Sequence, residues 1–174
     1  ELLSNLLKPN DRFLELGGCL GFLSSYVALK NGSDNVLTIE ANPEIVELMQ
    51  ENHQLNDVSP KVECAIAGVE DGVEQPFFVS INTWASSTKK GPDTHSILQQ
   101  TIDVNRLISD FNPTIISIDI EGGEVDLIPK LNLTTVRCII VEFHPQTTST
   151  SEMINTVKAL QEMNLYCSPE HTRG

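Results

Sequence analysis

The amino-acid sequence predicts an α/β domain built on a doubly wound, mostly parallel sheet. Apolar strand-like segments alternate repeatedly with helical patterns, and such alternation requires parallel strands joined by right-handed crossovers. An apolar run at 13–16 ends in a glycine-rich turn that a helical pattern follows at once, as in nucleotide-binding α/β units. The near-continuous apolar run at 114–120 is typical of a central strand covered on both faces.

The first part of the chain predicts a short leading helix and then three strands separated by two helices. The second of these helices has the clearest start, because Asn42 suits the N-cap and Pro43 the first helical position. The strands are expected at 12–16, 35–40 and 61–67, and the helices at 22–30 and about 43–55.

Residues 68–101 interrupt the alternation. Segments 73–81 and 97–102 have strand patterns, and a polar loop at 86–94 separates them, so we expect a β-hairpin inserted after the third strand. Trp84 lies in this insertion, where it serves either an acceptor-binding lid or the core of the hairpin.

The alternation then resumes to the end of the chain, so residues 1–174 are expected to form a single domain. A complete doubly wound sheet of seven strands needs two strands after the fifth, and only the start of one is expected, at 165–167. The C-terminal edge of the sheet is therefore expected to be incomplete. The remaining elements are helices at 103–111, after 121–124 and at 151–163, and strands at 114–120 and 136–143.

The charge and composition of the chain limit the kinds of partner that it can bind. The net charge of −13, from 24 acidic residues against 11 Lys and Arg, repels phosphate backbones and anionic membrane surfaces. We therefore expect neither nucleic acid nor a membrane as partner. The four cysteines include no C-x-x-C pair, which argues against a zinc site or a disulfide framework and favours a reducing cytoplasm.

The glycine-rich turn has the spacing Glu15-x-Gly17-x-x-x-Gly21 instead of the G-x-G-x-x-G of dinucleotide binders. This spacing disfavours a nicotinamide-dependent oxidoreductase and favours S-adenosylmethionine (SAM). Gly17, Gly18 and Gly21 would let the backbone approach the ligand, although the turn could equally serve strand–helix packing alone. Glu15 would meet the amino group of the methionine moiety.

Glu40 ends the second strand, where a carboxylate can accept hydrogen bonds from both ribose hydroxyls. The structural alternative is a solvated carboxylate at a strand end. Ligands of parallel sheets bind beyond the carboxyl ends of the strands. Four further strand-end residues are therefore expected to contact SAM: Ala41, Asn42, Ala65 and Ile66.

Three residues at the carboxyl ends of the fourth and fifth strands are candidates for the catalytic base: Asp119, Glu121 and His144. Clustered acids raise one another's pKa, which suits a base. Glu121 and Glu124 could instead only satisfy the first turn of the following helix, and His144 could be a packing residue.

A divalent cation is an alternative use of the same strand ends. Glu142 and His144 alternate along the fifth strand, which predicts that both side chains lie on one face. With Asp119 and Glu121 they offer ligands that suit magnesium, which would polarise an acceptor hydroxyl. We favour the reading without a metal.

Four segments resemble the FkbM-type SAM-dependent methyltransferases. The most specific is 116–124, in which 118–124 (I-D-I-E-G-G-E) is similar to the family's I-D-x-E-G-x-E signature. In segment 100–107, Thr101-Ile102-Asp103 resembles the family's T-L-D. Segments 13–22 and 37–43 are also similar. Ser117 departs from the family pattern, which commonly has Lys there, and Gly18-Cys19 replaces the usual Ala-Asn.

The resemblance implies a Rossmann-like class I methyltransferase fold, SAM as cofactor, and methyl transfer to a hydroxyl of a small molecule or glycan. The leading hypothesis is therefore a SAM-dependent O-methyltransferase. The alternative is a non-catalytic SAM-binding or scaffold module with the same fold, and it is motivated by the short C-terminal part of the sheet.

Overall fold

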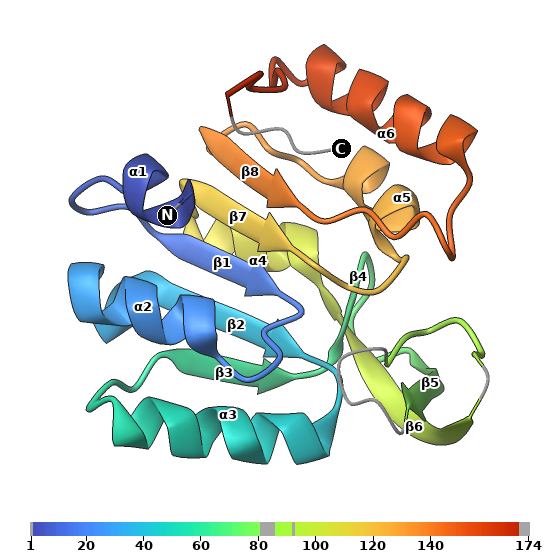
Figure 1. Ribbon diagram of the computed structural model, residues 1–174, viewed down its shortest axis with the longest axis horizontal. Coiled ribbons are helices and arrows are strands. Elements are labelled where there is room, and N and C mark those ends of the chain that lie inside the picture. Colours follow the sequence, from blue (N-terminus) through green and yellow to red (C-terminus); the bar gives the residue numbers. More distant parts are fainter. Residues whose placement is uncertain (1, 81–85, 92, 171–174) are drawn as a thin grey trace.

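The computed structural model describes residues 2–80, 86–91 and 93–170 of the chain. Its central parallel sheet contains β1 (Phe13–Leu16), β2 (Val36–Glu40), β3 (Lys61–Cys64), β7 (Ile115–Ile118) and β8 (Cys138–Val141). The strand order is β3-β2-β1-β7-β8 (Figure 1). The order reverses between β1 and β7, and ligands of doubly wound sheets bind at such a switch point. The predicted fold class is confirmed.

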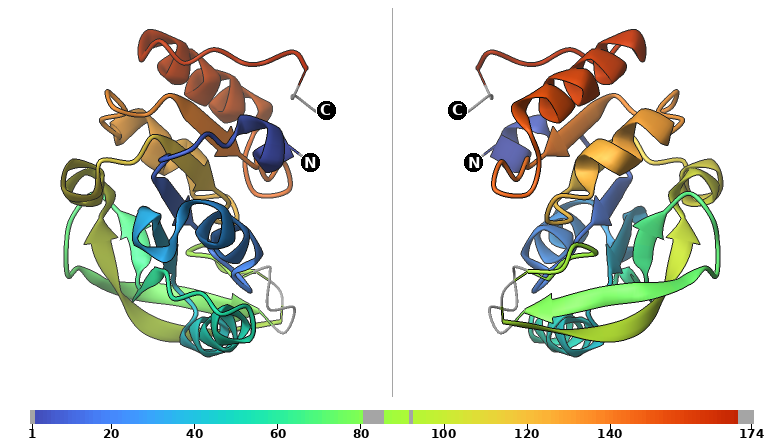
Figure 2. Two further views of the ribbon diagram at one scale, coloured as in Figure 1. Left: turned by 90° about the vertical axis from the view of Figure 1, so that its left-hand side faces the viewer. Right: turned by 90° about the vertical axis from the view of Figure 1, so that its right-hand side faces the viewer.

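Helices cover both faces of this sheet (Figure 2). Successive side chains of a strand point to opposite faces. Phe13 packs with Val27 on one side, and its neighbour Leu14 belongs to the core cluster of Leu107 on the other. Among the described residues, no helix has the length and apolar character needed to cross a membrane. The helices are α1 (Leu2–Leu6), α2 (Phe22–Asn31), α3 (Pro43–Leu55), α4 (Val104–Phe111), α5 (Glu124–Leu127) and α6 (Thr150–Glu162), with 3₁₀ turns at Ser33–Asn35 and Ile128–Lys130.

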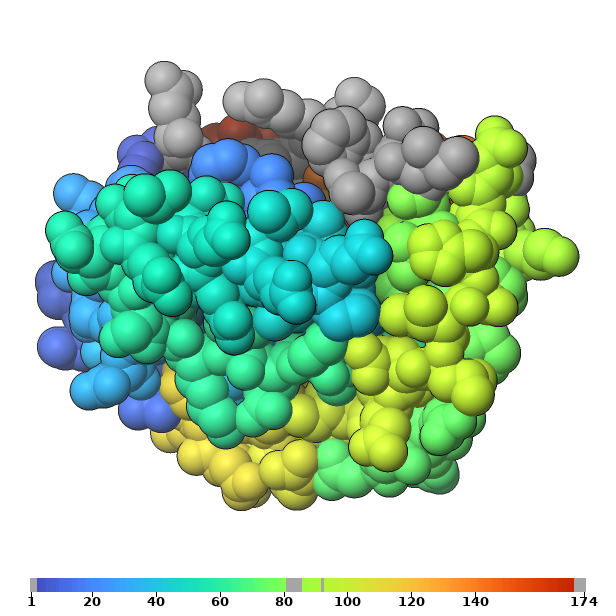
Figure 3. Space-filling view, turned by 90° about the horizontal axis from the view of Figure 1, so that it is seen from below, coloured from blue at the N-terminus to red at the C-terminus, as the bar shows by residue number. Residues whose placement is uncertain are grey.

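A second, three-stranded sheet contains the inserted hairpin. β5 (Glu74–Ser80) pairs antiparallel with β6 (Thr94–Asp103), as the sequence predicts, and β4 (Ile66–Gly68) pairs parallel with β6. Seen from below, α3 covers the left and centre of the molecule and β6 the right (Figure 3). The hairpin therefore extends the molecule beyond the carboxyl ends of the central strands.

Two predicted strands differ from the observed ones in a way that shapes the site. The strand expected at 61–67 divides at Ala65, whose N–H still donates to the Glu40 carbonyl while Ile66 joins the second sheet. The strand expected at 114–120 ends at Ile118, because its parallel ladder with β1 ends there. Asp119 therefore lies just past the end of β7, and its N–H still donates to the Leu16 carbonyl at 2.9 Å.

Two expectations for the last part of the chain are wrong. β8 ends at Val141, so strand alternation does not reach Glu142 and His144, and the first is exposed while the second is buried. Within the described residues 93–170, segment 165–167 forms no strand. Leu165 packs against the core, but Tyr166 is 73% exposed and the segment pairs with no neighbour.

Candidate functional site

Two cavities open at the switch point of the central sheet. The larger, of about 420 Å³, lies between the ends of β2 and β7, β4, the hairpin and α5. The smaller, of about 220 Å³, lies beside the glycine-rich turn, the start of α2 and the ends of β7 and β8. Gly17, Cys19 and Asp119 line both cavities. A ligand with two chemically different ends therefore has two adjoining compartments, which meet at the turn after β1.

Gly17 makes the close approach of this turn to β7 feasible. Its backbone has φ +83°, and a Cβ there would lie 1.7 Å from the Asp119 carbonyl oxygen. The N–H groups of Gly17 and Gly18 both donate to the Ile39 carbonyl, at 2.9 and 3.1 Å. The predicted need for glycine at position 17 therefore has two steric causes, a left-handed backbone and contact with a neighbouring strand.

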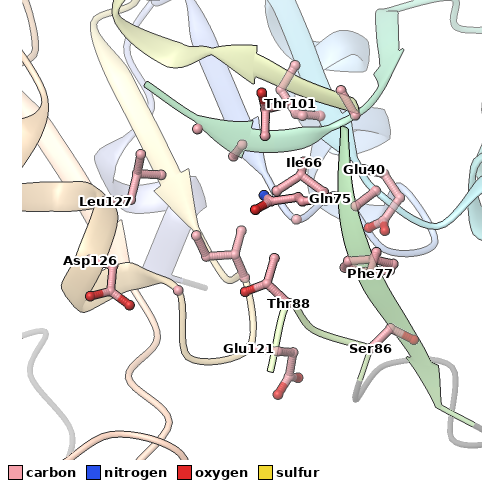
Figure 4. A pocket seen from close by; sticks show the side chains of 18 of the residues that line it. Glu40, Ile66, Gln75, Phe77, Ser86, Thr88, Thr101, Glu121, Asp126 and Leu127 are labelled. Atoms are coloured by element: carbon pink, nitrogen blue, oxygen red, sulfur yellow. The ribbon is translucent and has the colours of Figure 1, made fainter. Parts of the chain in front are cut away.

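Glu40 points into the larger cavity, near Ile66 and Phe77 (Figure 4). The backbone N–H of Cys19 donates to its Oε2 at 2.9 Å, and that of Asn42 to its Oε1 at 2.8 Å. Burial raises the pKa of Glu40, and these backbone hydrogen bonds act against the rise. Both oxygens are fixed and each keeps a lone pair for a further donor, an arrangement that suits two vicinal hydroxyls.

The other residues predicted at the ends of β2 and β3 divide into two groups. Ala41, Ala65 and Ile66 line the larger cavity with Glu40. Asn42 is 1% exposed and lies outside the lining of both described cavities; its side chain accepts the Glu44 N–H and caps α3. Its contribution to the site is the backbone N–H that holds Glu40.

Glu15 lines the smaller cavity and is only 3% exposed. The Thr38 hydroxyl donates to its Oε2 at 3.0 Å. Burial raises the pKa of Glu15 to about 8, against the lowering effect of hydrogen bonds from Thr38 and Ser24. The carboxylate of Glu40 adds to the rise. A buried carboxyl group without a cation at this place favours a ligand that brings a positive charge.

The remaining two glycines of the turn differ in their surroundings. Gly18 lines the smaller cavity, and a Cβ there would lie 2.1 Å from Thr38 Cγ2. Gly21 lies outside the lining of both described cavities and is the N-cap of α2, with φ +75°. A Cβ on Gly21 would meet His53 Nε2 at 2.7 Å.

The three predicted catalytic residues come together at the ends of β7 and β8. His144 Nε2 lies 3.4 Å from Asp119 Oδ1 and 3.4 Å from Glu121 Oε2. Asp119 lines both cavities and Glu121 lines the larger one, whereas His144 lies behind them, outside both linings. The three offer one ligand atom each within 4.8 Å of one another, so they could also hold a metal ion. Glu142, the fourth ligand of the predicted alternative, lies outside this group and lines the smaller cavity.

Glu124 fixes the orientation of His144. It is fully buried, and its Oε1 lies 3.0 Å from His144 Nδ1 while accepting the N–H groups of Ile120 and Gly122. The sequence interpretation, a carboxylate that only satisfies the first turn of the following helix, is wrong in two ways: the N–H groups that Glu124 accepts lie in the turn before α5, and Glu124 also contacts His144. This contact holds the imidazole by Nδ1, so that Nε2 faces Asp119.

The turn that carries Glu121 is held from outside by the end of the insertion. Glu121 has φ +53°, uncommon for a residue with a side chain. The Ser87 hydroxyl donates to its carbonyl at 2.8 Å, and Lys89 Nζ donates to the Gly122 carbonyl at 2.8 Å. Figure 4 shows Glu121 and Thr88 on the same side of the larger cavity. Trp84, the residue singled out in this insertion, lies outside the described residues.

Charge and burial tune Asp119. Burial raises its pKa to about 6, and the carboxylate of Glu142 adds to the rise, whereas His144 lowers it. Burial raises the pKa of Glu121 as well. A carboxyl group that ionises near pH 6 is deprotonated at neutral pH and is a stronger base than an ordinary aspartate.

A doubly wound sheet with the buried Glu15 and the partly buried Glu40 at its switch point has the arrangement of a ligand-binding α/β domain. The model of the methyltransferase FkbM domain matches residues 15–164, and the chain belongs to this family. The resemblance found in the sequence is therefore confirmed.

Two further comparisons with known proteins add no evidence about function. No curated protein sequence matches the chain. One matching crystal structure is that of a protein proposed to be an O-methyltransferase from Klebsiella pneumoniae, with 19% sequence identity and a TM-score of 0.45. The match covers 93% of this chain and 64% of that protein, so the chain spans less than two thirds of its length.

Proposed function

We propose that this chain is a SAM-dependent methyltransferase that acts on a hydroxyl group of a small molecule or glycan. The observation that carries the proposal is a pair of carboxylates in adjoining cavities on either side of Gly17: Glu15, which is buried, and Glu40, which is half-buried. Membership of the methyltransferase FkbM domain family supports it.

The residues of the two cavities fit the two ends of SAM. Glu40, with both oxygens held by backbone N–H groups, would accept the ribose hydroxyls. Ala65 and Ile66 provide apolar surface for the adenine. Glu15 would pair with the methionine amino group in the smaller cavity. SAM supplies a methyl group activated by a sulfonium; the chain's own residues bind it, exclude water and prepare the acceptor.

Among the three candidate bases, Asp119 is the best placed to take the acceptor's proton. It lines both cavities, so it lies where the methyl donor and an acceptor would meet. His144 contacts it from behind, can share the proton through Nε2, and is held by Glu124 through Nδ1. A carboxylate backed by an oriented imidazole can accept a hydroxyl proton as the oxygen forms its new bond to carbon.

Calorimetric titration with SAM tests the cofactor assignment. Glu40→Ala should weaken SAM binding at least about tenfold, the order expected for losing hydrogen bonds to a charged group. The matched control is Glu47→Ala, which removes an exposed carboxylate from α3, the helix that follows β2. This variant should leave the affinity for SAM unchanged. Equal affinity of the wild-type protein and Glu40→Ala would contradict the ribose assignment.

Two alternatives need separate measurements. S-adenosylhomocysteine formation over a panel of hydroxyl acceptors separates the enzyme from a non-catalytic SAM-binding module, which would bind SAM without turnover. Dialysis against EDTA separates the base from a metal ion. We expect activity to survive chelation; loss that Mg²⁺ restores would make Asp119, Glu121 and His144 cation ligands.

A further inference from the structure

Residues 86–89, in the loop of the inserted hairpin, face two parts of the molecule with alternate side chains. Ser86 and Thr88 line the larger cavity (Figure 4). Ser87 and Lys89 instead hydrogen-bond to the turn after β7, which carries Glu121. The segment is therefore both a wall of the cavity and a support of the turn beside it.

Ser87 attaches this segment to the second sheet. It is 6% exposed and pairs with Phe78 of β5, because its N–H donates to the Phe78 carbonyl at 3.0 Å and its carbonyl accepts the Phe78 N–H at 2.8 Å. Its hydroxyl accepts the Lys89 N–H at 3.2 Å and donates to the Glu121 carbonyl at 2.8 Å. The backbone and the hydroxyl of Ser87 thus connect the second sheet directly to the turn after β7.

The turn that receives these hydrogen bonds has an uncommon backbone. Glu121 and Gly122 are consecutive residues in left-handed conformations, with φ +53° and +96°. A left-handed residue with a side chain persists only where its surroundings hold it. The Glu121 carbonyl accepts from Ser87 and the Gly122 carbonyl from Lys89 Nζ, both at 2.8 Å. The insertion therefore holds the turn at the residue whose side chain lines the cavity.

Lys89 extends this support to the segment that carries His144. Its Nζ also donates to the Thr147 carbonyl at 3.3 Å, and the Thr147 N–H donates to the His144 carbonyl at 2.9 Å. An ammonium group has three donors, and two of them here bind carbonyl oxygens of two different segments. Lys89 therefore connects the turn of Glu121 to the segment of His144, and the side chains of these two residues lie 3.4 Å apart.

We propose that Ser87 and Lys89 are positioning residues for the catalytic side of the site. They act through Glu121 and His144, whose side chains they keep together at the edge of the larger cavity. Because the same segment also forms a wall of that cavity, it sets where an acceptor hydroxyl meets the proton-accepting group. This inference rests on the proposed function, because it concerns the acceptor side of the same site.

Kinetics and calorimetry on three variants test the proposal. Lys89→Met keeps the length of the side chain but removes its donors. It should lower kcat for S-adenosylhomocysteine formation on a panel of methyl glycosides at least about tenfold, because small displacements of reacting groups cost large factors in rate. The affinity for SAM should stay unchanged. Ser87→Ala should act in the same direction, and Lys89→Arg, which keeps the donors, should restore much of the rate.

NMR signals of the His144 ring provide a readout that needs no acceptor. With S-adenosylhomocysteine bound, Lys89→Met should shift these signals, which are identified by their absence in His144→Gln. The matched control is Lys90→Met. Lys90 is the next residue and exposed, and within the described part of the chain it makes no hydrogen bond or ion pair, so this variant should match the wild-type protein in rate and spectrum.

Either a wild-type kcat or unshifted His144 signals in Lys89→Met would overturn the positioning role. A loss of SAM affinity as large as the loss of rate would also overturn it, because the variant would then have damaged the whole site. If the wild-type protein binds SAM but methylates none of the glycosides, the His144 signals alone decide. A wild-type protein that binds no SAM would overturn the proposed function itself.

Discussion

The carboxylates at the two halves of the switch point have different surroundings. At the ends of β1 and β2, Glu15 and Glu40 are held by neutral donors, a hydroxyl of Thr38 and two backbone N–H groups. At the ends of β7 and β8, Asp119 and Glu121 face each other and an imidazole 3.4 Å away. Among the described residues, no cationic side chain pairs with Glu15 or Glu40, whereas the second group contains an imidazole.

This difference separates binding from proton transfer. Fixed donors with no counter-charge form a site that is completed by a positively charged ligand. Carboxyl groups whose pKa is raised, in contact with an imidazole, suit the removal of a hydroxyl proton that the proposed methyl transfer requires. The comparison predicts that changes on one side alter ligand affinity, whereas changes on the other alter turnover.

The largest expected effect belongs to Asp119→Asn. The amide keeps the size of the side chain but cannot accept a proton, so kcat should fall at least about a hundredfold, the usual contribution of a general base. SAM affinity, measured by calorimetry on the same protein, should change only a few-fold. A large loss of SAM affinity with unchanged kcat would show that Asp119 binds SAM and is not the base.

The rate of the wild-type enzyme should depend on pH in the same sense. The pKa of Asp119 is raised to about 6, so the base form is lost as the pH falls through that value. We expect kcat to decline below about pH 6 and the decline to vanish in the residual activity of Asp119→Asn. Initial rates of S-adenosylhomocysteine formation across pH provide the measurement.

The next effect concerns Glu124, which connects the two turns of the catalytic side. Glu124→Leu would leave His144 Nδ1 and the N–H groups of Ile120 and Gly122 without their acceptor. One orphaned buried group costs about 1–3 kcal/mol, so the free energy of unfolding should fall by at least about 2 kcal/mol in urea denaturation. Glu124→Gln keeps one acceptor oxygen and should lose less. Equal stability of both variants and the wild-type protein would contradict this role.

Local patterns in the sequence predicted where Glu15, Gly17 and Glu40 lie in the sheet. The acid at the end of each strand and the glycine at position 17 follow from strand geometry and steric limits, which act over a few residues. The inserted hairpin was also predicted, because alternation and turn residues indicate strands wherever they lie.

The residues that contact these side chains could not be predicted from local sequence patterns. Thr38 donates to Glu15 from the neighbouring strand, and nothing in the pattern of β2 distinguishes it from an ordinary polar residue. The alternation that placed Glu142 and His144 on one face failed because β8 ends at Val141. Where a parallel strand ends depends on its neighbours' registers, and these are tertiary facts.

The smallest effect concerns the stability of the ligand-free protein and tests whether Glu15 lacks a counter-charge. Burial raises the pKa of Glu15 from its ordinary value of 4.5 to about 8 in the folded protein, so the unfolded chain loses this proton first as the pH rises. Stability should therefore decline between about pH 5 and about pH 9, and Glu15→Gln should reduce the decline and raise the melting temperature by about 3 °C at the upper end. Burial raises the pKa of Glu40 and Asp119 too, so some decline of stability with pH persists in Glu15→Gln.

Saturating SAM brings a cation to Glu15. It should flatten the dependence of melting temperature on pH in the wild-type protein and leave that of Glu15→Gln nearly unaltered. If the two proteins show the same pH dependence without ligand, Glu15 already has a counter-charge in the folded protein.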